Sequence, residues 1–119
     1  MRQTVFNELE AVPVTIASGT SLSAAVNCGG LRLFGLVMPA AWTTANLTFQ
    51  MSHDGGATWV NMYDASGTEL TTPAAASRFI AVDPAQFAAV TLIKVRSGSA
   101  ATAVNQAQDA VVSLILRSV

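Results

Sequence analysis

Residue types that commonly act in catalysis or metal binding are scarce in this chain of 119 residues, which has one cysteine, one histidine and 11% charged side chains. One cysteine cannot form a disulfide within the chain, and one histidine leaves no Cys/His ligand set for a structural zinc ion. Six basic residues against seven acidic ones give a net charge of −1, so the basic surplus that nucleic-acid binding needs is missing. We therefore expect no cofactor, no metal ion and no nucleic-acid partner.

Two stretches lack charge for about twenty residues, residues 11–31 and 33–53. Proline, glycine, asparagine and threonine interrupt both at short intervals, which argues against membrane spans. The first ten residues lack the apolar core of a secretory signal. We expect a chain made in the cytoplasm, with no membrane partner and with Cys28 reduced and semi-buried.

Apolar and polar residues alternate along most of the chain, which predicts β-strands. In the clearest run, Leu47, Phe49 and Met51 alternate with polar residues. Turn-forming clusters rich in glycine, asparagine and aspartate separate the runs. The eight predicted strands are residues 12–17, 22–26, 31–38, 46–52, 58–63, 78–82, 91–97 and 110–117.

Eight short strands with connections of Greek-key length predict an all-β, antiparallel, jelly-roll-like sandwich. An immunoglobulin-like sandwich is the alternative, but its Cys…Trp…Cys spacing is missing. We expect residues 1–11 to form an extended N-terminal arm and residues 12–119 a single domain. A helical turn is expected where Asp83 precedes Pro84, and an exposed loop over residues 98–109.

Several predicted strands are apolar on both faces, although a strand face that meets water should be polar. Large exposed apolar patches usually mark association, and interface centres are depleted in charge, as this whole chain is. We therefore predict a face for assembly with other copies, although a covering loop or scattered exposed residues would also account for the pattern. Its predicted members are Phe34, Leu36, Leu92, Val111 and Ile115.

The most specific local pattern runs from Ser52 to Trp59 and reads S-x-D-x-G-x-T-W. It resembles the Asp-box turn of sialidase propellers, but the chain is too short for a propeller. Aspartate can accept backbone N–H groups inside such a turn, and glycine supplies an unusual φ. We interpret Ser52, Asp54, Gly56, Thr58 and Trp59 as a structural turn without a catalytic role.

Other candidate sites are weaker. His53 and Asp54 are adjacent in sequence and no Gly-x-Ser-x-Gly elbow is present, so we expect no catalytic residues and no enzyme. Calcium could bind between strands, with Asp54 or Asp64 as the first places to look. Exposed rings at Trp42 and Tyr63 are the candidates for glycan contact.

Four segments together suggest a family: residues 47–59, 62–69, 79–87 and 93–98. They resemble small, jelly-roll-like β-sandwich proteins of the virions of tailed bacteriophages and gene transfer agents. The resemblance implies a non-enzymatic virion component, such as a capsid decoration, head-spike or accessory protein. It also implies a symmetric homo-oligomer, with a trimer favoured, bound to the major capsid protein or another virion protein. The alternative is a carbohydrate-binding module, or a tail or baseplate accessory protein that binds glycans.

Overall fold

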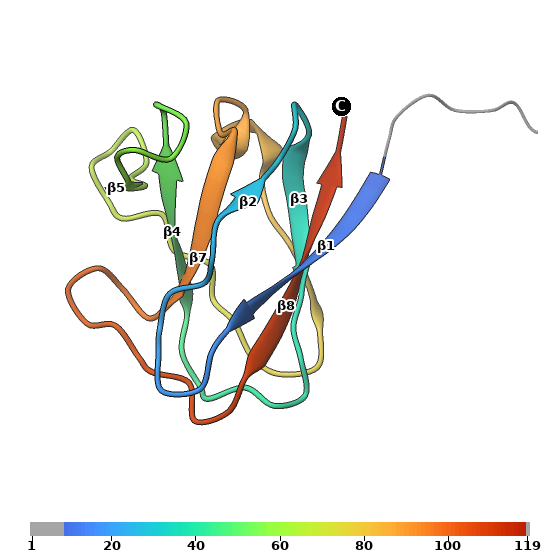
Figure 1. Ribbon diagram of the computed structural model, residues 1–119, viewed down its shortest axis with the longest axis vertical. Coiled ribbons are helices and arrows are strands. Elements are labelled where there is room, and N and C mark those ends of the chain that lie inside the picture. Colours follow the sequence, from blue (N-terminus) through green and yellow to red (C-terminus); the bar gives the residue numbers. More distant parts are fainter. Residues whose placement is uncertain (1–8, 119) are drawn as a thin grey trace, which may run out of the picture.

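The computed structural model describes residues 9–118, which form eight strands and one short 3-10 helix (Figure 1). None of the helical structure in this range is long and apolar enough to cross a membrane. The elements are β1 (Leu9–Ile16), β2 (Val26–Asn27), β3 (Arg32–Val37), β4 (Leu47–Ser52), β5 (Val60–Asn61), β6 (Phe79–Ala81), η1 (Pro84–Phe87), β7 (Leu92–Ser97) and β8 (Ala110–Arg117).

Two antiparallel sheets of four strands face each other, in the orders β1-β8-β3-β6 and β2-β7-β4-β5. Apart from the β4–β5 hairpin and η1, successive strands cross from one sheet to the other, and these strand orders are those of a jelly roll. The predicted fold class is thus confirmed, and each predicted strand region overlaps one strand of the structure, although the region 22–26 shares only Val26 with β2. β1 is an edge strand with Pro13 in its middle, where its missing N–H is tolerated.

β1 begins earlier than the sequence predicted. Residues 9–11 were expected in an N-terminal arm, but they pair with residues 115–117 of β8. Their backbone groups complete the ladder at the open end of the sheet, so they belong to the sandwich. The rest of the expected arm, residues 1–8, lies outside the described residues.

The core lies between the sheets and is made of the inward residues of both. Phe49 of β4 and Phe87 of η1 meet edge to face, with ring centroids 5.2 Å apart and an interplanar angle of 84°, a favoured aromatic geometry. The expected helical turn is therefore present, and it inserts Phe87 into the core. Asp83 caps it by accepting a hydrogen bond from the Ala85 N–H at 3.0 Å.

A β-bulge in β3 changes which of its residues face the core. Leu33 pairs with Leu116 of β8 and Gly35 with Ile115, so Phe34 is an extra residue in the ladder. The alternation therefore changes phase, and Leu33 and Leu36 both point inward, with 1% and 0% of their surface exposed. Leu36 was predicted on the assembly face, and this prediction is wrong because the bulge turns the residue into the core.

We predict that Leu36→Ala lowers the free energy of unfolding by about 2–5 kcal/mol, because it opens a cavity in the core. Val111→Ala on the outer face of β8 should change it by no more than about 0.5 kcal/mol. Chemical denaturation monitored by circular dichroism measures both. Equal losses for the two variants would contradict the bulge.

Candidate functional site

The turn between β4 and β5 brings together the five residues of the S-x-D-x-G-x-T-W pattern. The Ser52 hydroxyl donates to Asp54 Oδ1 at 2.8 Å and accepts the Gly56 N–H at 2.8 Å. Asp54 Oδ1 also accepts the Thr58 N–H at 2.8 Å, and Trp59 Nε1 donates to the Gly56 carbonyl at 3.1 Å. Gly56 has a φ of 100°, a conformation that few other residues adopt. These contacts give every residue of the pattern a task inside the turn.

Hydrogen bonding to the ionised form sets the acidity of both turn aspartates. The Thr58 N–H and the hydroxyls of Thr58 and Ser52 lower the pKa of Asp54 to about 2. In the next turn Asp64 Oδ1 accepts the N–H groups of Thr68 and Ser66 and the Ser66 hydroxyl, which lowers the pKa of Asp64. The two carboxylates named as first places for calcium are therefore engaged with the chain itself. Within residues 9–118, no three His, Cys, Asp or Glu side chains are grouped to hold a metal ion.

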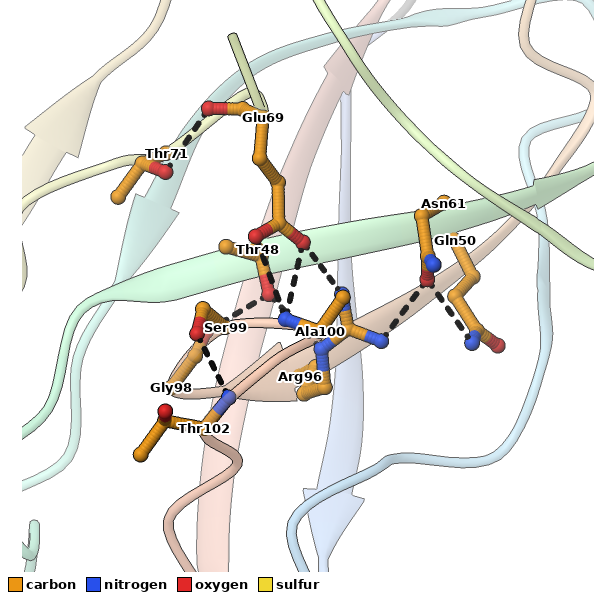
Figure 2. Close-up of polar contacts among 10 residues, drawn as sticks. All are labelled: Thr48, Gln50, Asn61, Glu69, Thr71, Arg96, Gly98, Ser99, Ala100 and Thr102. Carbon is orange, nitrogen blue, oxygen red and sulfur yellow. Dashed lines mark hydrogen bonds and ion pairs between the residues drawn. The ribbon is translucent and has the colours of Figure 1, made fainter.

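A buried polar cluster lies on the outer face of the β2-β7-β4-β5 sheet, centred on Arg96 of β7 (Figure 2). Arg96 Nη2 contacts Glu69 Oε2 at 2.7 Å, and the side chains of this ion pair are only 8% and 15% exposed. The cluster also includes three contacts of these two side chains: Arg96 Nε donates to Thr48 Oγ1 at 2.9 Å, Arg96 Nη1 donates to Asn61 Oδ1 at 3.0 Å, and the Ala100 N–H donates to Glu69 Oε2 at 3.1 Å.

The cluster is a cross-link between segments. It ties β4, β5, β7, the strand-like segment at Glu69 and the loop at Ala100 to one another. No buried side-chain nitrogen or oxygen lacks a hydrogen bond in the described part of the chain. This cluster could not be predicted from the sequence, because its partners are separated by 27 to 48 residues.

The loop over residues 98–109 is largely exposed, as predicted, but Gln106 is an exception at 1% exposed. Its amide oxygen accepts the Thr43 N–H at 2.8 Å, and its nitrogen donates to the Thr43 carbonyl at 3.0 Å and to Ser97 Oγ at 2.7 Å. Gln106 thus fastens this loop to the β3–β4 connection and to the end of β7.

The two predicted glycan-contact rings do not share a site. Trp42 is half-buried against the core, and its Nε1 donates to the Ala45 carbonyl at 3.3 Å. It borders a recess of about 120 Å³ beside Gln106. Tyr63 is 57% exposed and borders a different recess, of about 300 Å³, with Asp64 and Gln86.

The outer face of the β1-β8-β3-β6 sheet carries exposed apolar side chains from every strand, and we call it the apolar face. Four of the six exposed large hydrophobic residues lie here: Leu9, Val37, Phe79 and Val111. Strand register adds smaller outward residues between them. The members of the apolar face are Leu9, Ala11, Pro13, Thr15, Gly35, Val37, Phe79, Ala81, Val111, Ser113 and Ile115.

The five predicted assembly residues do not lie together. Val111 and Ile115 lie on the apolar face, and the bulged Phe34 is half-buried. Leu36 is in the core, and Leu92 is on the other sheet, beside the Ser52–Trp59 turn. The apolar face is therefore real, but its larger members Leu9, Val37 and Phe79 were not among the predicted residues.

Comparison with known proteins gives no relative: no family model matches the chain, and neither a curated protein nor a solved structure matches it.

We predict that ionised Asp54 stabilises the fold above a pH of about 4 and that this contribution is lost as the pH falls toward 2. The sign follows from its lowered pKa of about 2, since the unfolded chain binds the proton first. Asp54→Asn should therefore lower Tm most at pH 6, and the difference from the unmutated chain should shrink on acidification. Thermal melts at pH 6, 4, 3 and 2 measure it. A Tm difference independent of pH would contradict this assignment.

We also predict that Glu69→Ala lowers the free energy of unfolding by about 3 kcal/mol, because it leaves the Arg96 guanidinium buried without its counter-charge. The double variant Glu69→Leu/Arg96→Met should recover at least half of that loss, since no buried charge remains. Urea denaturation of the three proteins measures both changes. A double variant less stable than Glu69→Ala would show that the cluster acts through its other hydrogen bonds.

Proposed function

We propose that this protein is a non-enzymatic structural protein of a bacteriophage virion. The most specific form of the proposal is a capsid decoration protein, or a head-spike or accessory protein, that forms a symmetric homo-oligomer on the particle. The observation that carries it is the apolar face, which covers most of one side of a small jelly roll. An uncharged sheet face of this kind favours contact with another protein.

The charged side chains whose contacts are described above have structural roles, which supports a role in binding to another protein. Asp54 and Asp64 hold turns, and Arg96 and Glu69 hold a cross-link. Nucleophilic catalysis needs a nucleophile and a base within reach of one another and of a substrate. The four side chains just named instead form their hydrogen bonds within the chain. Cys28 is 3% exposed and burial raises the pKa of its thiol, which makes it a poor nucleophile.

The resemblance of residues 47–59, 62–69, 79–87 and 93–98 to small virion β-sandwiches supports the placement on a particle. A glycan-binding module is the second candidate expected from the sequence. It has less support, because Trp42 is half-buried and hydrogen-bonded and Tyr63 is left as a single ring beside its recess. Stacking platforms for ligands usually need well-exposed aromatic rings.

We predict that the chain is a constituent of phage-like particles. An epitope-tagged copy, expressed in the strain of origin during particle production, should sediment with the particles in a density gradient. Quantitative mass spectrometry of that fraction should find it in a fixed ratio to the major capsid protein. Val111→Glu, which places a charge on the apolar face, should reduce this ratio, and Val60→Glu on β5 should not. Absence of the tagged chain from washed particles would overturn the proposal.

A further inference from the structure

Charges of opposite sign flank the two ends of the apolar face. Along β8 the outward row is Val111, Ser113 and Ile115, and it ends at Arg117. Asp109 lies one residue before the strand at the other end and is exposed. The row therefore has an acid at one end, an uncharged middle and a base at the other end, with Ser113 at its midpoint.

The basic end of this row has an excess of positive charge. Arg32 of β3 pairs in register with Arg117 of β8, and like charges directly opposite each other destabilise a sheet. Neither arginine forms an ion pair with a residue in the range 9–118. At the acidic end Asp109 Oδ1 accepts the Ser18 N–H at 2.8 Å, and no cation of the described chain pairs with it. Both ends are thus suited to a partner of opposite charge.

We propose that two copies of this chain pack their apolar faces together about a twofold axis near Ser113, which brings Arg32 and Arg117 of each copy to Asp109 of the other. The proposal rests on the proposed function and names its contact surface. In a twofold contact each copy uses the same surface. If the β8 strands of the two copies run antiparallel, the arginines of each copy lie next to Asp109 of the other at both ends of the contact. A parallel arrangement would place arginine against arginine.

The middle of the face suits this packing. The row through Ser113 contains Pro13 on one side, and Val37 and Phe79 on the other. None of these residues is charged, so none loses the hydration of an ion when the sheets meet. Facing sheets pack about 10 Å apart with their strands nearly aligned.

The size of the face predicts a weak contact. Four strands about 4.8 Å apart and a row of six residues rising about 3.4 Å each give a surface of roughly 19 by 20 Å. That is roughly 380 Å² per copy, below the about 800 Å² per partner of a standard specific contact, so we expect a weak, transient contact with a micromolar dissociation constant. The twofold contact differs from the trimer that the family resemblance implies, and the number of copies in solution distinguishes the two.

The test is sedimentation velocity of the purified chain from about 1 to 500 µM, a range that spans the expected affinity. A concentration-dependent dimer is expected. Val111→Glu should weaken it by about 100-fold or more, because two unpaired charges would be buried. Val60→Glu is the matched control: Val60 is 42% exposed and Val111 46%, but Val60 lies on the other sheet. Its dimer should be unchanged.

Charge exchange tests the orientation. Asp109→Lys and Arg117→Glu should each weaken self-association by about 10-fold, because the twofold repeats each repulsion at both ends. An equimolar mixture of the two variants should form a heterodimer, since the introduced lysine then meets the introduced glutamate, and Arg117 of the first variant meets Asp109 of the second. Unchanged thermal melts establish that both variants are folded.

Three results would overturn this inference: a monomer up to 500 µM, a trimer, or a mixture that associates no better than its components. The outcomes separate this inference from the proposed function. A monomeric chain that is present in particles refutes the twofold contact alone, and a dimer absent from particles refutes the virion role alone.

Discussion

The ion pair between Arg96 and Glu69 is the interaction on which the arrangement of one whole side of the protein depends. Arg96 Nη2 lies 2.7 Å from Glu69 Oε2, and the segments at Glu69 and Ala100 shield the pair from solvent. A guanidinium at this depth needs a partner for its charge and its N–H groups, and Thr48 and Asn61 supply the remaining acceptors. The outer face of the β2-β7-β4-β5 sheet is therefore closed by its own polar groups.

The two sheets consequently differ in what they present to the outside. The inner faces share one core, but the outer face of one sheet is satisfied within the chain and that of the other sheet is apolar. Only 11% of the residues are charged, and this difference between the two sheets shows where the few polar groups are used. Polar side chains are concentrated on the turns and on one sheet, and one broad face is left with few of them.

The strands and the Ser52–Trp59 turn could be predicted from the sequence because their signals are local. Alternation is visible over six residues, and the bonds of Asp54 and Ser52 span at most four residues. The bulge could not be predicted, since Phe34 is as apolar as its neighbours and an extra residue leaves no trace in composition. The Arg96 cluster was equally hidden, because a charged residue in an alternating strand indicates an exposed face until the segments that cover it are known.

Pro13 has a consequence for how the protein can grow into larger assemblies. Open strand edges invite addition of further strands, which leads to fibres. The edges here are unsuited to that: β2 and β5 have two residues each, β6 has three, and the one long edge, β1, has a residue without an N–H in its middle. These features disfavour the addition of strands at all four edges, and at the one long edge it is Pro13 that does so, in a chain with few charges to keep its copies apart.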